Sequence, residues 1–394
     1  MRLNEKCRQQ LLESARLAGE WYCNCQNTPR HPWGGVEESA DEGRFIYEYF
    51  PATGKCRGMG VWGQAVAIMA LLPLSKSVQY EGDKYEYAAK LAGEYLKSLQ
   101  VINPSDKLAH GAFCEHTPQT RWSYPRDAAT GAMGFLALYV HTKEQEFLDR
   151  AKLFGEWFHG PGGDKGHWPH GHFDFVKGPL DGAYIRGDWQ IGGGLVYPWL
   201  TALTGETKWM DQYYRPQIDA LMDLYDRNAD APVKIGFHGF DALSFSNDDF
   251  AMIAMVCAYR HWREERMLNI IRHHMRRLWQ TMDDDGSYPS YAGTFVTNIE
   301  TIEYVDLARE MNLKEDFAGL EQRILKTATF GMTLQETQLR DPRAYGGFYG
   351  QSHYGVSRDR IHHRDAGYSM IMDLRLVGAT PVPYYSAYGW AKPK

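Results

Sequence analysis

The feature that most constrains this chain is a set of twelve apolar stretches with helical spacing. In each of them apolar residues recur at intervals of three and four, which is the pattern of an α-helix with a buried face. These stretches cover residues 5–25, 61–75, 83–102, 126–141, 143–159, 188–204, 206–227, 247–262, 263–282, 296–312, 314–334 and 363–378. The sequence therefore predicts an all-α protein.

The links between these stretches alternate between short and long. The short links are Thr142-Lys143, Gly205, Trp262-Arg263 and Asn312-Leu313. The long links are rich in glycine, proline and aromatic residues, and they cover 27–60, 103–125, 160–187, 228–246, 283–295 and 335–362. Because a short link makes its two helices antiparallel neighbours, the pattern predicts helical hairpins joined by long loops.

Weak internal repetition favours one repeated unit over several unrelated domains. Ala18-Gly19-Glu20-Trp21, Ala92-Gly93-Glu94-Tyr95 and Phe154-Gly155-Glu156-Trp157 stand at like places on three odd-numbered helices, and a Gly-x-aromatic step such as Gly111-Ala112-Phe113 follows several of these helices. A two-helix unit that recurs about every 60 residues must stack on copies of itself to bury its apolar faces. We therefore expect residues 1–394 to form one domain.

The even-numbered helices indicate how the hairpins are arranged. Segments such as GVWGQAVAIMALL (60–72) are apolar nearly all round and rich in small residues. A helix without a polar face is buried on every side. The odd-numbered helices, such as 264–279, instead carry the charged stripe of an outer surface. In an open solenoid, solvent would contact one side of both helical layers. The pattern therefore favours a closed ring, the (α/α)6 barrel of six hairpins.

The charge of the chain excludes several partners. A net charge of −6 and a pI near 6.2 provide no basic field for nucleic acid or for anionic membranes. The chain has no run of about 18 apolar residues, so no membrane span is predicted. The first 21 residues are charged and helical and lack the apolar core of a signal peptide, which makes a cytoplasmic location the expectation. Nothing in the sequence indicates an oligomeric state.

Neither a metal nor another cofactor is expected. The six cysteines are scattered and suit reduced thiols better than a disulfide framework. His167, His170 and His172 are spaced like metal ligands, but they lie in a loop and lack a zinc signature. Substrate binding or helix capping explains these histidines more simply.

The hairpin topology predicts where a ligand would bind. Every long loop leads into the N-terminus of an inner helix, so all six loops meet at one face of the ring. The candidate binding residues at this face are Trp62, Trp122, Arg126, Asp127, His170, His172, Arg186, Asp188, Trp189, Gln190, Asn247, Asp248, Asp249, Tyr349, His363 and Arg364. Acids, histidines and aromatic rings over an apolar barrel are typical of a ligand funnel.

Two carboxylates in this set could carry acid–base chemistry. Asp127 and Asp188 begin neighbouring inner helices, whose axes pack about 8–10 Å apart. A protonated carboxyl can donate to a glycosidic oxygen while an ionised one activates water. Burial near Trp189 would raise the pKa of one acid, and Arg126 or Arg186 would lower that of the other. Either aspartate could instead simply cap its helix.

At these residues the chain resembles the unsaturated glucuronyl and rhamnogalacturonyl hydrolases, which are (α/α)6 barrels. The resemblance lies in Asp127-Ala128-Ala129-Thr130-Gly131 and in Asp188-Trp189-Gln190-Ile191-Gly192-Gly193, each with the helix that follows. It implies a catalytic aspartate at the head of each of these helices and a substrate-binding histidine, His170 or His172, in the loop between them. The chain departs from the family at Asn247-Asp248-Asp249, where those enzymes have Trp-Gly-Arg.

The resemblance also implies a reaction and a substrate class. One aspartate would protonate the C4=C5 double bond of a terminal unsaturated uronic residue and direct water to C5. Arg186, Arg364 or His363 would hold the uronate carboxylate, because an anionic oligosaccharide needs a cationic partner.

Four alternatives remain open from the residues alone. A lyase on this scaffold would use His363, Arg364 and Tyr349, or the His167–His172 cluster. An inverting glycosidase would pair Asp127 or Asp188 with Asp248 or Asp249. A sugar epimerase would oppose His170 or His172 to His363. A helical binding module without enzymatic activity is the fourth.

Overall fold

The computed structural model describes residues 3–29, 41–58, 60–78, 81–163, 170–180, 194–228, 251–288, 294–352 and 355–378. Twelve α-helices lie in this part of the chain, as the sequence predicts. The odd-numbered ones are α1 (Glu5–Cys25), α3 (Gly82–Leu99), α5 (Gln145–His159), α7 (Arg215–Asn228), α9 (Glu265–Trp279) and α11 (Phe317–Met332). The even-numbered ones are α2 (Val61–Ser77), α4 (Pro125–Thr142), α6 (Val196–Thr204), α8 (Ala251–Trp262), α10 (Thr294–Glu310) and α12 (His363–Leu376).

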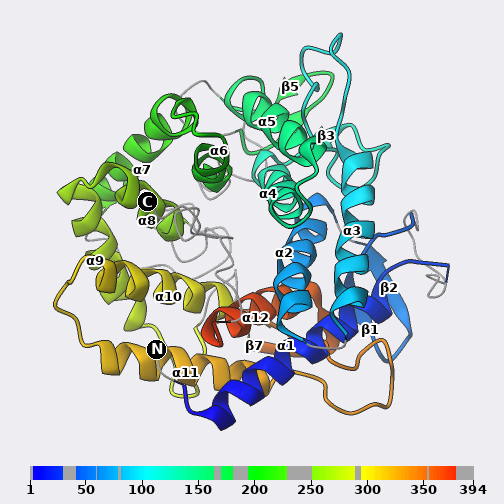
Figure 1. The fold of residues 1–394 in the computed structure, drawn as a ribbon, viewed down its shortest axis with the longest axis vertical. Coiled ribbons are helices and arrows are strands. Elements are labelled where there is room, and N and C mark those ends of the chain that lie inside the picture. The colour runs from blue at the N-terminus through cyan, green and yellow to red at the C-terminus, as the bar shows by residue number, and fades with distance from the viewer. Residues whose placement is uncertain are drawn as a thin grey trace.

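The helices form two concentric rings (Figure 1). The even-numbered helices surround the centre, and the odd-numbered helices lie outside them. The first inner helix, α2, packs against both α4 and the last inner helix, α12. A contact between the first and the last inner helix closes the ring, so the fold is the (α/α)6 barrel expected from the sequence and not an open solenoid.

The small residues of the inner helices allow them to approach closely. A Cβ atom added at Gly134 of α4 would lie 2.9 Å from the Cβ of Ala65 in α2, and one at Gly131 would lie 2.6 Å from Val61. The glycines are therefore what brings these two backbones together. In the outer ring, α9 turns Met267 and Ile271 inward and leaves Arg266 and Arg276 exposed.

The short links end their inner helices in the left-handed conformation. Lys143, Gly205, Arg263 and Asn312 have φ values of 64°, 73°, 59° and 52°. One left-handed residue just after a helix turns the chain sharply and satisfies terminal carbonyl groups. This turn sends the chain directly from the inner ring to the outer ring, which confirms the predicted hairpin links.

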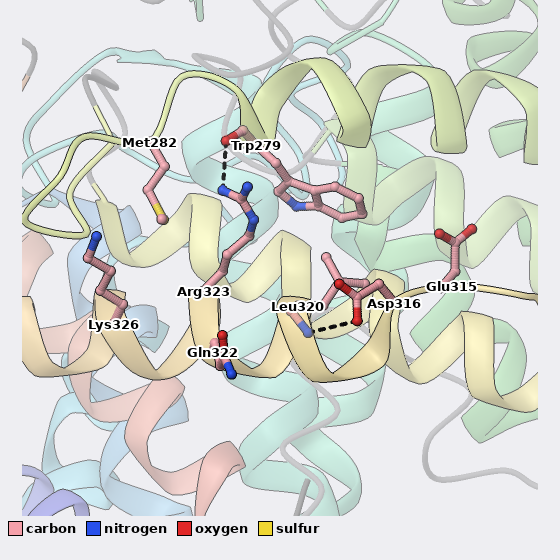
Figure 2. A pocket seen from close by; sticks show the side chains of 9 residues that line it. Trp279, Met282, Glu315, Asp316, Leu320, Gln322, Arg323 and Lys326 are labelled. Carbon is pink, nitrogen blue, oxygen red and sulfur yellow. Dashed lines mark hydrogen bonds between the residues drawn. The ribbon is translucent and has the colours of Figure 1, made fainter.

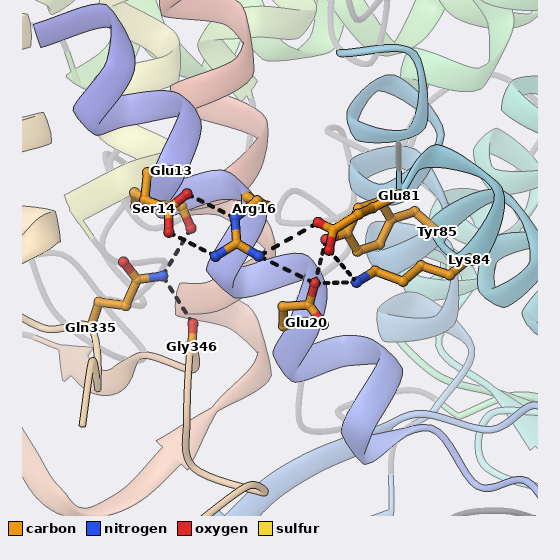
Figure 3. Close-up of polar contacts among 9 residues, drawn as sticks. All are labelled: Glu13, Ser14, Arg16, Glu20, Glu81, Lys84, Tyr85, Gln335 and Gly346. Atoms are coloured by element: carbon orange, nitrogen blue, oxygen red, sulfur yellow. Dashed lines mark hydrogen bonds and ion pairs between the residues drawn. The ribbon is translucent and has the colours of Figure 1, made fainter. Parts of the chain in front are cut away.

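Polar contacts on both sides of α1 complete the outer ring (Figure 3). On one side, Glu20 binds Lys84 and accepts a hydrogen bond of 2.7 Å from the Tyr85 hydroxyl, both on α3. On the other side, the Gln335 side chain donates to the carbonyl oxygens of Ser14 (2.9 Å) and Gly346 (3.0 Å). Helix α1 is thereby joined both to the next outer helix and to the chain that follows α11.

Two of the predicted loops contain a β-sheet that the sequence did not indicate. Its antiparallel strands are β1 (Ile46–Phe50), β2 (Lys55–Gly58), β6 (Tyr349–Ser352) and β7 (Gly355–His362), in the order β2-β1-β7-β6. Strands β1 and β7 pair because α2 and α12, which follow these segments, are neighbours in the closed ring. A smaller sheet contains β3 (Trp122–Ser123), β4 (Phe173–Asp174) and β5 (Gly178–Pro179).

The predicted outer helix 206–227 is also interrupted. Residues Trp209–Tyr214 form a π-helix, labelled η2, before α7 begins. The sequence pattern did not indicate this change in helical pitch.

A buried ion cluster joins three inner helices toward their C-terminal ends. Arg260 of α8 lies 3.1 Å from Glu303 of α10, and Arg375 of α12 binds the same glutamate. Arg375 also lies 3.0 Å from Asp306, and Arg260 lies 3.0 Å from Glu310. The inner ring is therefore not wholly apolar. Within the described ranges, we find no helix that combines the length and the apolarity of a membrane span.

Candidate active site

Asp127 lies in the first turn of α4, at the face where the long connections enter the inner ring. Pro125 is the first residue of the helix, a position that suits its fixed φ and its missing amide hydrogen. The Asp127 side chain is 26% exposed, and its Oδ1 accepts a hydrogen bond of 2.9 Å from Nη1 of Arg126. The carboxylate is therefore partly open to solvent and is held by a cation at a helix N-terminus, where negative charge is favoured.

Glu115 is a buried acid next to Asp127 that the sequence pattern did not indicate. It is only 3% exposed, and its carboxyl contacts the carboxyl of Asp127. Its Oε2 accepts a hydrogen bond of 2.9 Å from the amide of Tyr124. Burial, and then the charge of Asp127, raise the pKa of Glu115 well above its ordinary value. The sequence feature that could have indicated Glu115 is its position two residues after the recurring Gly111-Ala112-Phe113 step.

An aromatic wall adjoins these acids. It consists of Trp122, Tyr124, His172 and His116, and neighbouring rings lie 4.8–5.2 Å apart. Strand β3 pairs Trp122 with Asp174 of β4, which brings the segment containing His172 against the start of α4. Burial lowers the pKa of His172, so its imidazole is neutral near pH 7. His170 lies on the same segment, with its ring 6.2 Å from that of Phe173.

A second aromatic group lies where α2 and α12 begin. The indole of Trp62 donates a hydrogen bond of 3.1 Å to the Tyr368 hydroxyl, and the His363 ring lies 5.7 Å from that of Trp62 and 5.1 Å from that of Tyr22. His363 is completely buried, and burial lowers its pKa to about 3. The sequence suggested that His363 could hold a carboxylate as a cation. At this pKa the buried imidazole is neutral and supplies no positive charge, which favours an arginine for that role.

Arg364 and Tyr349, two further predicted binding residues, both contact nearby side chains in the described structure. Arg364 lies next to His363 at the start of α12, with its guanidinium 3.9 Å from the buried Asp365. The Tyr349 hydroxyl donates a hydrogen bond of 2.7 Å to Glu336, and the Arg358 guanidinium lies over its ring. Tyr349 thus belongs to the β6–β7 hairpin and has contacts there.

The structure brings together Trp122, Arg126, Asp127 and His172 from the predicted set. Seven predicted residues lie outside the described residues, namely Arg186, Asp188, Trp189, Gln190, Asn247, Asp248 and Asp249. The pairing of Asp127 with Asp188 therefore stays a prediction. In the described residues, no cluster of three or more His, Cys, Asp or Glu side chains has the arrangement of a metal site.

A separate hollow lies on the outer wall between α9 and α11 (Figure 2). Its volume is about 450 Å³, and Trp279, Arg323 and Lys326 are among its lining residues. Its two acids have structural contacts: Glu315 lies 3.1 Å from Arg272, and Asp316 accepts a hydrogen bond from the Gly319 amide as the N-cap of α11. Figure 1 places these helices across the ring from α4. The candidate acid–base residues at α4 are therefore separate from this hollow.

Comparison with known proteins defines the fold of this chain. No protein-family model and no curated protein sequence matches it. Among solved structures, it resembles a family 76 glycoside hydrolase (a mannosidase) from Bacteroides thetaiotaomicron, with 11% identity, a TM-score of 0.60, and coverage of 93% of this chain and 98% of that one. It also resembles the cellobiose 2-epimerase of Spirochaeta thermophila, with 15% identity, a TM-score of 0.65, and coverage of 96% and 98%. The chain has the six-hairpin (α/α)6 fold.

A third solved structure agrees. The cellobiose 2-epimerase of Bacillus thermoamylovorans matches with 13% identity, a TM-score of 0.62, and coverage of 93% of this chain and 100% of that one. At such identities the likeness concerns the fold, because one scaffold can host unrelated activities. The closer resemblance to unsaturated glucuronyl hydrolases stays a prediction.

Proposed function

We propose that this protein is a carbohydrate-processing enzyme and that it hydrolyses uronic-acid-containing oligosaccharides with Asp127 as an acid–base residue. The observation that carries this proposal is the partly exposed Asp127 carboxylate, held by Arg126 beside an aromatic wall. Sugars present flat apolar faces with polar edges, and an aromatic wall with a neighbouring carboxylate complements both. The solved structures of similar fold include a mannosidase and cellobiose epimerases, which supports a carbohydrate substrate.

The second catalytic group must come from another inner helix. Glycosidases place their two carboxyls about 5–5.5 Å apart when a covalent intermediate forms, and about 6.5–9.5 Å apart when water attacks directly. The side chains of Glu115 and Asp127 share a hydrogen bond, so their carboxyls are closer than either mechanism requires. Asp188, which precedes the next inner helix, α6, in the sequence, is the candidate for the second group.

The substrate we propose is anionic and carries a terminal unsaturated uronic residue. One aspartate would donate its proton to C4 of the double bond while water adds to C5 and returns a proton to the carboxylate. The hemiketal formed at C5 then opens and releases the remaining sugar. Arg364 and Arg186 are the candidates for binding the uronate, because His363 is neutral.

Turnover of unsaturated uronic disaccharides tests this proposal. We expect the ultraviolet absorbance of the conjugated double bond to disappear as the reducing sugar is released. Equal turnover of a matched neutral disaccharide would contradict the anionic substrate. An increase in this absorbance on intact polyuronate would show a lyase instead.

Sugar epimerisation is the second candidate, and a specific observation favours it. His172 lies in the aromatic wall with a lowered pKa, so a neutral imidazole is available as a base. Its expected partner, His363, is completely buried, which favours hydrolysis over a mechanism with two opposed histidines. Formation of an isomeric disaccharide without bond cleavage would establish epimerisation and contradict hydrolysis.

A further inference from the structure

Glu115 is held in place by its backbone as well as by its side chain. Its carbonyl oxygen accepts a hydrogen bond of 2.8 Å from the Val61 amide at the start of α2, and its amide donates one of 3.1 Å to the Trp122 carbonyl. The Tyr124 amide binds the side-chain oxygen Oε2. Glu115 therefore joins the starts of two neighbouring inner helices, α2 and α4, and its carboxyl has little freedom to move.

The contact between the carboxyls of Glu115 and Asp127 requires a proton. Two ionised carboxylates in contact repel each other, whereas a single proton shared between them forms a hydrogen bond. Because Oε2 of Glu115 already accepts the Tyr124 amide hydrogen, the proton belongs on the other oxygen, Oε1. From there it can be donated to Asp127.

The surroundings decide which acid keeps this proton. The charged groups that act on Glu115 are Asp127 and the Arg126 guanidinium, and His116 follows it in the chain. Glu115 is almost completely buried, while Asp127 is partly exposed and directly bonded to Arg126. Burial disfavours charge on Glu115, so the proton that the two carboxyls share stays on the glutamate.

Gly60 packs closely against Glu115. A Cβ atom added at Gly60 would lie 2.6 Å from the Glu115 carbonyl oxygen and 3.0 Å from its Oε1. A side chain at residue 60 would therefore clash with Glu115, and glycine avoids this clash. Glycine at position 60 therefore allows the Glu115 side chain to be buried beside Asp127.

We propose that Glu115 is a positioning residue that remains protonated and donates a hydrogen bond to Asp127, which fixes that carboxylate for the reaction. This inference rests on the function proposed above. Glu115 does not contact the substrate in this proposal. Its role is to orient Asp127 and to keep the pair at a single negative charge.

Substitution of Glu115 tests the proposal, because glutamine resembles a protonated glutamate. Glu115→Gln keeps a donor toward Asp127 and an acceptor for the Tyr124 amide, so we expect turnover at neutral pH to fall by only about threefold. Glu115→Ala removes the donor and should lower turnover about tenfold to a hundredfold. The wild-type pH profile should have an alkaline limb from ionisation of Glu115, and this limb should be absent in Glu115→Gln. Glu144→Gln, on the exposed start of α5, is the matched control.

A Glu115→Gln enzyme that is as inactive as Asp127→Asn, although folded, would overturn the proposal, because Glu115 would then act in its ionised form. A second measurement separates this inference from the proposed function. Titration of the side-chain carboxyls by carbon NMR in the enzyme without substrate should show Glu115 titrating well above the ordinary range. A Glu115 signal in the ordinary range would overturn the inference even if hydrolysis is confirmed. Wild-type turnover by Asp127→Asn would instead overturn the proposed function.

Discussion

Arg126 and Asp127 are neighbours in the chain, and the Arg126 guanidinium donates a hydrogen bond of 2.9 Å to the Asp127 carboxylate. Arg126 is itself nearly buried, so solvent screens this pair less than it screens a pair on the surface. The pair orients the carboxylate at the start of α4, next to the aromatic wall.

Asp127→Asn should abolish the acid–base function of this site. Asparagine has nearly the same shape but cannot accept or donate the catalytic proton, so we expect kcat on an unsaturated uronic disaccharide to fall by at least about a hundredfold. The melting temperature should change little. Asp149→Asn, at an exposed position on α5, is the control. Near-normal activity of Asp127→Asn would remove this residue from catalysis.

Trp122→Ala should weaken substrate binding more than it slows the chemical step. Loss of one face of the aromatic wall should raise KM about threefold to tenfold, with a smaller change in kcat. Trp122→Phe should recover most of the affinity. Tyr87→Ala, on the outer helix α3, removes an exposed ring and should leave KM unchanged. Equal KM values for Trp122→Ala and wild type would place the sugar elsewhere.

Glu303→Gln should strongly destabilise the inner ring. It leaves Arg260 and Arg375 buried without the carboxylate that both of them contact. Breaking a buried ion pair by removing one partner costs about 3–5 kcal/mol, whereas an exposed pair contributes less than about 1 kcal/mol. Glu206→Gln, which breaks the surface pair with Lys152, is the comparison. Similar denaturation midpoints for the two variants would show that the buried cluster contributes little.

Lys143→Gly should stabilise the protein by about 0.5–1 kcal/mol. Lys143 occupies a left-handed conformation after α4 that glycine adopts without a steric cost. Gly205→Ala, at the equivalent link after α6, should destabilise the protein by a similar amount. Asn312→Gly should have a smaller effect, because asparagine tolerates this conformation better than lysine does. Chemical denaturation of the three variants measures this series, and a destabilised Lys143→Gly would contradict it.

His274 should make the protein less stable in acid. Burial first, with the Arg277 and His273 charges, lowers its pKa from the ordinary value of 6.5 to about 3. The unfolded chain therefore takes up a proton at a higher pH than the folded protein does. This contribution to the free energy of unfolding is complete above pH 6.5 and is lost progressively as the pH falls toward 3. His274→Leu should flatten the dependence in this window, and an unchanged slope would contradict the assignment.

Local patterns were sufficient for the helices and for most of their ends. Helix α4 is predicted over residues 126–141 and extends from Pro125 to Thr142, because apolar periodicity and turn-forming residues act within a few positions. The same locality explains the correct short links. It also explains the missed π-helix at Trp209–Tyr214, since a change in helical pitch leaves little trace in an apolar pattern.

The sequence by itself determined the six hairpins, their inner and outer order, and the candidate face that carries Asp127. Only the tertiary structure decided the pairing of β1 with β7, whose strands are about 300 residues apart in the chain. It also decided the state of two ionisable groups. Burial against Asp127 raises the pKa of Glu115, and burial beside Tyr22 and Trp62 lowers the pKa of His363. A pKa depends on the whole environment of a group, and that environment exists only once the ring has closed.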